Sequence, residues 1–138
     1  MAFTAQDVKA LREKTGVGMM ECKKALVEAD GDMDKAVDFL RERGLAAAQK
    51  KATRIAAEGV VLPYYDAPAK KGVVVEVNSE TDFVAKNEKF MNFVEGVAKT
   101  ILATNPADVE ALKEEKFDGT DRTVTETLND LVLSIGEN

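Results

Sequence analysis

A strand, a turn and the start of a helix are encoded by Gly72-Val73-Val74-Val75-Glu76-Val77-Asn78-Ser79-Glu80-Thr81-Asp82-Phe83-Val84-Ala85-Lys86. The β-branched run at the beginning favours a strand. The polar residues around Ser79 and Thr81 then form a turn or helix-cap cluster. After the cluster, apolar residues recur at helical spacing, at Phe90, Phe93, Val94, Val97 and Ile101. The sequence therefore predicts that Phe83 lies at a junction between a strand and a helix.

Phe83 is an aromatic residue at a position where a turn is usually polar. Loops on a rigid scaffold concentrate binding groups, and an apolar ring beside the carboxylate of Asp82 can insert into a partner protein. The same ring can instead fill the core of its own domain. The spacing of the residues leaves both interpretations open.

The composition favours a soluble binding protein over an enzyme. The chain has 138 residues, 45% of them hydrophobic, enough for one small domain or a mini-domain with a larger one. It has no histidine, the commonest general base and metal ligand. The single cysteine, Cys22, excludes an internal disulfide and a cysteine zinc cluster. We therefore expect no catalytic residues, no metal site and no cofactor.

Charge and hydropathy also indicate the compartment and the partners. The net charge of −6 disfavours nucleic acid as the main partner. No stretch is long and apolar enough for a signal peptide or a membrane span. We expect a protein of the reducing cytoplasm that binds neither nucleic acid nor a membrane.

Three short helices are predicted before Gly44. Thr4 and Thr15-Gly16 bound the first, Asp30-Gly31 ends the second, and Asp32 caps the third. The unit is small, so the helices must share one tight core.

Met19 and Met20 follow the turn between the first two predicted helices. Methionine adapts well to binding surfaces, yet at helical spacing it is more often part of a core. We expect one of the two to be buried and the other to be offered to a partner.

Residues 45–57 are alanine-rich and basic, with no acidic residue before Glu58. Alanine favours helix, but the apolar periodicity is too weak for a packed one. We interpret 45–58 as a partly helical linker. Its positive charge can meet a carboxylate or phosphate surface or can simply be solvated.

Strand patterns begin at Gly59. Pro63 interrupts the first, which places it at a sheet edge or at a bulge. The turn 66–72 leads into the strand Val73–Val77 and completes a hairpin, which a helix over 87–104 should cover. Two further helices are expected, a short acidic one and a last one capped by Thr123 with Glu126.

A two-stranded hairpin is marginal in water and leaves open edges, so we expect a fragment of a longer protein or a short form that dimerises through the exposed sheet edge.

Two motifs resemble signatures of the bacterial translation elongation factor Ts family. Leu11-Arg12-Glu13-Lys14-Thr15-Gly16-Val17-Gly18-Met19-Met20-Glu21-Cys22-Lys23-Lys24-Ala25-Leu26 is similar to the first, and Glu76 to Lys86 to the second. The resemblance runs from about Ala5 through Asn138 and is looser between Asn105 and Thr123.

The expected fold class is α+β. The first module, 1–44, resembles a ubiquitin-associated-like three-helix bundle. A basic linker over 45–58 and a core subdomain over 59–138 follow, the latter a small antiparallel sheet covered by helices. Compared with the family, this subdomain is expected to be truncated at its C-terminus.

The resemblance implies a guanine-nucleotide exchange factor for the GTPase elongation factor Tu, which it would bind in the GDP-bound and nucleotide-free states. Phe83 would wedge between helices of the partner near its metal site, and Asp82 would disturb the groups that position Mg²⁺. Thr81 and Val84 would hold the shape of the loop by capping and by packing. The family's other contacts fall on Leu11, Met19, Met20, Lys23, Lys51, Ile135 and Gly136. No bond is made or broken, so the resemblance implies that the protein is not an enzyme.

Two other classes of function are compatible with parts of the sequence. A ubiquitin-associated-like adaptor would explain the first module but would give no function to the segment Thr81–Val84. A carboxylate-based hydrolase using Glu80 and Asp82 is less consistent with the sequence, because loop carboxylates are usually solvated and no second acid or metal cluster accompanies them.

Overall fold

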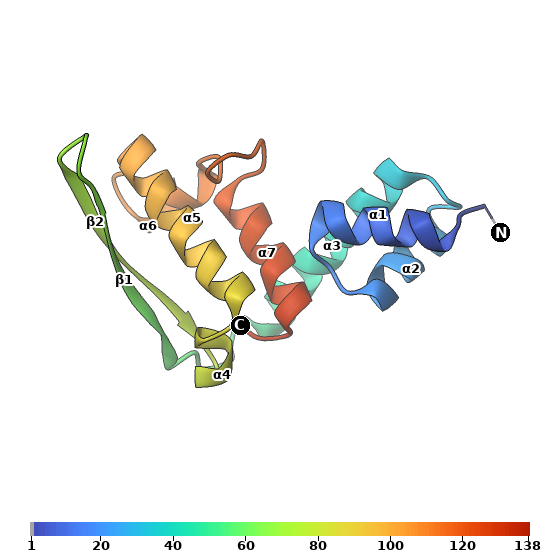
Figure 1. Cartoon of the computed structure of the whole chain (residues 1–138). Helices are drawn as coiled ribbons and strands as arrows, with labels where there is room; N and C mark the ends of the chain where they lie inside the picture. The colour runs from blue at the N-terminus through green and yellow to red at the C-terminus, as the bar shows by residue number, and fades with distance from the viewer. Residues whose placement is uncertain (1) are drawn as a thin grey trace. The chain divides into compact units, whose positions relative to one another are not determined.

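The computed structural model describes residues 2–138 and has an α+β fold, as predicted (Figure 1). In chain order its elements are α1 (Ala5–Thr15), α2 (Met19–Glu28), α3 (Met33–Lys51), β1 (Glu58–Asp66), β2 (Lys71–Ser79), α4 (Asp82–Ala85), α5 (Glu88–Thr104), α6 (Val109–Glu114) and α7 (Val124–Ile135). None of the helices in this part of the chain is long and apolar enough to cross a membrane.

The residues group into two compact units. The helical unit contains Met1–Thr53 and Asn129–Glu137, and the sheet unit contains Arg54–Leu128 with Asn138. The domain division at residues 44 and 58 stays a prediction.

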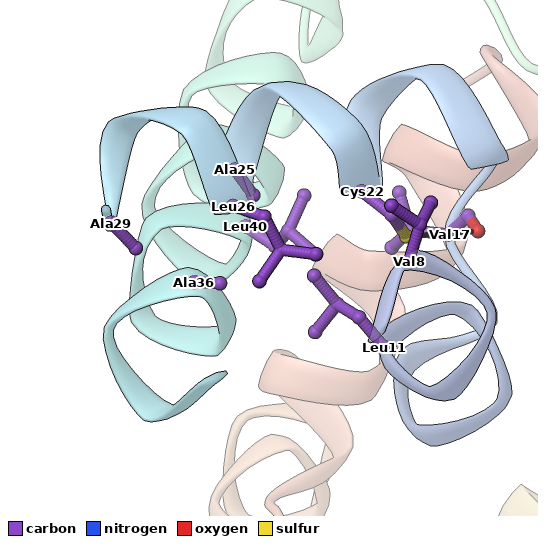
Figure 2. Packing of buried hydrophobic residues seen from close by; sticks show 9 residues of the cluster. All are labelled: Val8, Leu11, Val17, Cys22, Ala25, Leu26, Ala29, Ala36 and Leu40. Atoms are coloured by element: carbon purple, nitrogen blue, oxygen red, sulfur yellow. Dashed lines mark hydrogen bonds between the residues drawn. The ribbon is translucent and has the colours of Figure 1, made fainter. Parts of the chain in front are cut away.

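The three predicted helices form the helical unit's core (Figure 2). Figure 2 shows the buried apolar side chains of this core, which come from the three helices and from the segments that join them: Val8, Leu11, Val17, Cys22, Ala25, Leu26, Ala29, Ala36 and Leu40. Thr4 and Asp7 form a capping box at the start of α1, and Gly16 ends this helix in the left-handed conformation, with φ 72°. Asp32 caps α3 by accepting a hydrogen bond from the backbone N–H of Lys35. The caps at Thr4 and Asp32 and the stop at Gly16 were predicted and are confirmed.

The third helix was predicted to end before Gly44. In the structure it continues to Lys51, so this predicted boundary is wrong. Gly44 is buried, and a Cβ there would lie 3.1 Å from the carbonyl oxygen of Asn129. The glycine is therefore required by a close backbone approach and is not a stop signal. Three alanines at 46–48 then favour continuation of the helix. The expected linker is thus helical over its first half.

The hairpin of the sheet unit is antiparallel, and its register pairs Val60 with Val77 and Pro63 with Val74. The pairing continues through Pro63 without a bulge, so of the two predicted alternatives, edge or bulge, the edge position is confirmed. Alternate side chains such as Leu62 are partly shielded while their neighbours are exposed. Figure 1 shows α5 lying along this hairpin, which it contacts on both strands, as predicted.

Helix α5 supplies the core of the sheet unit. Its buried side chains include Phe90 and Phe93, and the Phe93 ring stacks on Phe117 with 5.6 Å between the ring centroids. Gly96 is buried beneath the Phe117 ring, which a Cβ at this position would strike. Thr100 donates a hydrogen bond to the Gly96 carbonyl and accepts one from the N–H of Asp118. These contacts fix the segment that follows α6 against α5.

Candidate functional site

The segment between β2 and α5 is a short ordered turn, which we call the Phe83 loop (residues 80–87). Its only helical element is the single turn α4. The Thr81 hydroxyl accepts a hydrogen bond from the N–H of Val84 at 3.4 Å, so this threonine caps α4 as the resemblance implied. The buried Ser79 hydroxyl donates to the carbonyl oxygen of Thr81 at 2.8 Å. The entry to the loop is therefore fixed by side chains on the strand and on the cap.

The exit of the loop is fixed as well. The N–H of Asn87 donates to the carbonyl of Val84 at 2.9 Å. The Asn87 side chain then caps α5 by accepting hydrogen bonds from the N–H groups of Lys89 and Phe90. These hydrogen bonds restrain the backbone conformation within the loop.

Phe83 lies at the tip, and its side chain is 82% exposed. The interpretation in which it fills the core of its own domain is therefore wrong. Its neighbour Asp82 is also exposed, whereas Val84 is partly buried. The loop thus exposes a carboxylate and an apolar ring at consecutive positions, and the partly buried Val84 follows them. In a complex, the Phe83 ring can be buried in the partner while the Asp82 carboxylate interacts with polar groups of the partner nearby.

A second candidate surface lies on the helical unit, at the turn between α1 and α2. Met19 and Met20 are 44% and 69% exposed, and Lys23 is exposed one helical turn later. The expectation that one methionine is buried is wrong. Val17, in the turn before them, is buried instead and fills the core at this end of the helices.

Leu11 has no exposed surface and is part of the core that supports this turn. A direct contact of its side chain with a partner would require the core to open. Any contribution to binding would therefore pass through the packing of α1 against α2. Its role in partner binding stays a prediction, as do the roles of the other predicted site residues.

The end of α7 lies beside the same turn within the helical unit. The Ser134 hydroxyl donates to the carbonyl of Gly16 at 2.8 Å, and Leu133 packs against the core. The partly buried Ile135 and the exposed Gly136, with φ 84°, follow directly. Residues at opposite ends of the chain therefore meet on one side of this unit. Lys51, predicted in the linker, is the last residue of α3 and is partly exposed.

Two side chains of the helical unit, Cys22 and Glu21, have shifted pKa values, and both take part in packing or ion pairing within that unit. Burial raises the pKa of the Cys22 thiol, although the Thr15 hydroxyl opposes the change. For Glu21, burial opposes ionisation, but Lys24 and Arg43 outweigh it and lower the pKa of the carboxyl. The Arg43 Nε lies 2.7 Å from Glu21 Oε2, which ties α3 to α2. Within residues 2–138, no group of three or more histidine, cysteine, aspartate or glutamate side chains could hold a metal ion.

The fold and both surfaces define a small α+β protein that exposes apolar side chains on a hydrogen-bonded loop and at the turn between two helices. Residues 80–138 match the family model for elongation factor TS. The chain is 58% identical to an elongation factor Ts of Clostridium perfringens over 136 residues, 99% of this chain and 45% of that protein. It is 56% identical to that of Syntrophotalea carbinolica and 54% identical to that of Trichlorobacter lovleyi, in each case over all of this chain and 45% of the relative.

The chain matches the N-terminal portion of elongation factor Ts proteins. It spans less than half the length of these curated relatives.

Three features of the site were missed by sequence reasoning. They are the buried hydroxyl of Ser79, the ion pair between Arg54 and Glu80, and the bond from Ser134 to Gly16. A serine beside a cap is a visible local signal. The other two join residues far apart in the chain, and no local pattern marks them.

Proposed function

We propose that this chain promotes release of GDP from the translational GTPase elongation factor Tu. The observation that carries the proposal is the exposure of Phe83 at the tip of a loop whose two ends are hydrogen-bonded. The similarity to elongation factor Ts proteins supports the choice of partner. The chain spans 45% of the length of its relatives, so nucleotide exchange by this chain is proposed and is not inferred from the relatives' name alone.

The proposed mechanism follows from how GTPases hold their nucleotide. The phosphates are bound by the amides and lysine of a glycine-rich loop and by a bridging Mg²⁺. A factor that binds the nucleotide-free GTPase more tightly than the GDP-bound form must weaken GDP binding by the same factor, because the two equilibria are linked. The exchange factor therefore needs contacts that form fully only when the metal and phosphate site is disturbed. No covalent bond changes in this process, so the activity is not enzymatic.

The Phe83 loop has the groups for this task. The exposed ring of Phe83 would bury itself between partner helices, and the neighbouring carboxylate of Asp82 would compete for the polar groups that position Mg²⁺. Thr81 and Val84 would keep the loop in shape, the first by its cap and the second by its partial burial. A preformed loop loses little conformational entropy on binding, which favours affinity.

The helical unit would supply a separate contact. Met19 and Met20 offer adaptable apolar surface next to the charge of Lys23. Ile135 and Gly136 follow Ser134, whose hydroxyl is bonded to Gly16 in the same turn, and would extend that surface. Lys51 would add a positive charge from the end of α3. Leu11 would support these groups from the core. In this proposal the helical unit contributes affinity and the Phe83 loop disturbs the metal site.

The test is release of a fluorescent GDP analogue from elongation factor Tu in the presence of the chain. We expect acceleration that diminishes when EDTA has already removed the Mg²⁺, since metal displacement then contributes nothing. Equal acceleration with and without EDTA would eliminate metal displacement from the mechanism. No acceleration in either condition would contradict the proposed function.

We also propose self-association through the sheet edge. In the described part of the chain the sheet has two strands, so each strand has one edge without a neighbouring strand. Sedimentation equilibrium should then show a dimer at high concentration, and a Val74→Pro change, which places a proline in β2, should weaken it. A strictly monomeric chain at all concentrations would refute this proposal.

A further inference from the structure

An ion pair lies at the base of the Phe83 loop. Oε1 of Glu80, the first residue of the loop, lies 3.6 Å from Nη1 of Arg54. Arg54 precedes β1, and Glu80 follows β2 directly. The pair therefore closes the end of the hairpin at which Glu58 faces Ser79. It joins the chain segment that enters the hairpin to the segment that leaves it for the loop.

The carboxylate of this pair is the more enclosed partner. The side chains of Glu80 and Arg54 are 17% and 51% exposed, respectively. The Oε1 atom of Glu80 is buried and has no hydrogen-bond partner among the described residues. A carboxylate oxygen withdrawn from water needs a compensating positive charge nearby. Arg54 is the cation that the described structure pairs with it.

The backbone on both sides of the pair is also held. The side-chain amide of Asn138 donates to the carbonyl oxygen of Arg54 at 2.9 Å. On the other side, Ser79 and Thr81, the two neighbours of Glu80, are joined by the hydrogen bond from the serine hydroxyl. A side chain fixed to an anchored segment can therefore limit how the loop swings about the end of β2.

We infer that Arg54 is a positioning residue for the Phe83 loop, acting through Glu80. By holding this carboxylate it fixes the direction in which Phe83 and Asp82 point. The inference rests on the proposed function for its consequence in nucleotide exchange, but the positioning itself is a property of the free chain. Without Arg54 the loop would sample more orientations, and the partner would have to select the productive one, which lowers the rate of exchange at a given concentration.

The positioning can be measured without a partner. The chain has no tryptophan, so Phe83→Trp places a single reporter at the loop tip. In this background Arg54→Ala should lower the fluorescence anisotropy of the tryptophan, and Arg54→Lys should restore most of it. The matched control is Lys113→Ala, which removes an exposed ion pair with Glu110, 3.0 Å long, elsewhere in the sheet unit. The control should leave the anisotropy unchanged, and an equally unchanged value for Arg54→Ala would overturn the inference.

The consequence for exchange is tested in the chain that retains Phe83. Arg54→Ala should lower the kcat/KM of GDP release about two- to fivefold, the range expected for a half-exposed ion pair. Glu80→Gln should have the same effect, and the double variant no larger one. In a background that carries both Phe83→Ala and Asp82→Ala the Arg54→Ala effect should vanish, because neither group that Arg54 positions is left. A full further loss in that background would mean that Arg54 contacts the GTPase directly, and would also overturn the inference.

Failure of the proposed exchange activity and failure of the positioning by Arg54 give different results in these experiments. If the unaltered chain does not accelerate GDP release, the proposed function fails, while the anisotropy still decides the positioning. Thermal unfolding of each variant checks folding. If Arg54→Ala does not fold, Glu80→Gln and Arg54→Lys carry the same comparison.

Discussion

Replacing Phe83 by alanine should separate binding from folding. A fully buried phenylalanine typically costs about 3–5 kcal/mol of stability when truncated to alanine. Less than a fifth of the Phe83 side chain is buried, since 82% of it is exposed. The variant should therefore lose less than about 1 kcal/mol of unfolding free energy. Its melting temperature and circular dichroism spectrum should stay close to those of the unaltered chain.

The same exposure sets the expected loss of exchange. A phenylalanine ring buries about 150 Å² or more, and at roughly 25 cal/mol per Å² its exposed part can contribute about 3 kcal/mol when a partner covers it. Each 1.4 kcal/mol is a factor of about ten, so kcat/KM for GDP release should fall roughly a hundredfold. The assay is release of a fluorescent GDP analogue from elongation factor Tu, titrated with each variant.

Phe90→Ala is the matched control. Phe90 has the same side chain and lies seven residues away, but it is 3% exposed in the core of the sheet unit. It should lower the unfolding free energy by about 3–5 kcal/mol. The reasoning is refuted if Phe83→Ala unfolds as readily as Phe90→Ala, or if it folds normally and exchanges at the original rate.

Three further outcomes are expected. The concentration of this chain that half-saturates GDP release should exceed that of a full-length relative by about tenfold or more, since ~1.4 kcal/mol of absent contact suffices, while the saturating rate falls less; an unchanged half-saturation with a collapsed rate would refute this. Gly96→Ala should lower the unfolding free energy by about 1–2 kcal/mol, because its methyl group strikes the Phe117 ring, and an unchanged melting temperature would contradict the packing. Hydrogen bonds from Thr4 lower the pKa of Asp7, so this cap stabilises above the ordinary aspartate pKa and is lost as pH falls through the lowered value; the difference in melting temperature between the unaltered chain and Asp7→Asn should therefore shrink below about pH 4, and a constant difference would count against it.

The elements that were predictable from the sequence are those with local causes. Thr4 and Asp32 cap helices through atoms three residues away, and Gly16 ends a helix through its own backbone conformation. Such signals lie within one turn of the chain and can be recognised without the fold. The strand-to-helix junction around Phe83 is confirmed for the same reason.

The errors arise where a distant residue decides the outcome. From the sequence, Gly44 is predicted to end a helix. In the structure the backbone of Asn129 lies so close to Gly44 that a side chain does not fit there, and this explains the glycine. Met19 has helical spacing for burial, but Val17 occupies the core at that end. For Phe83, spacing alone allowed both burial and exposure, and only the path of the chain distinguishes them. The ion pair of Arg54 likewise depends on how the hairpin brings two segments together.

The bond from Ser134 to Gly16 has a consequence for the order of events during synthesis. Leu133, which packs on the helical unit's core, follows Thr53, the last residue of that unit's first segment, by 80 residues. At ~5–20 residues per second, the first three helices would wait about 4–16 s for this partner to be made. During that interval the turn carrying Met19 and Met20 lacks its support from the end of α7. The nascent chain would therefore leave the core surface that Leu133 later covers open to chaperones until α7 has been made.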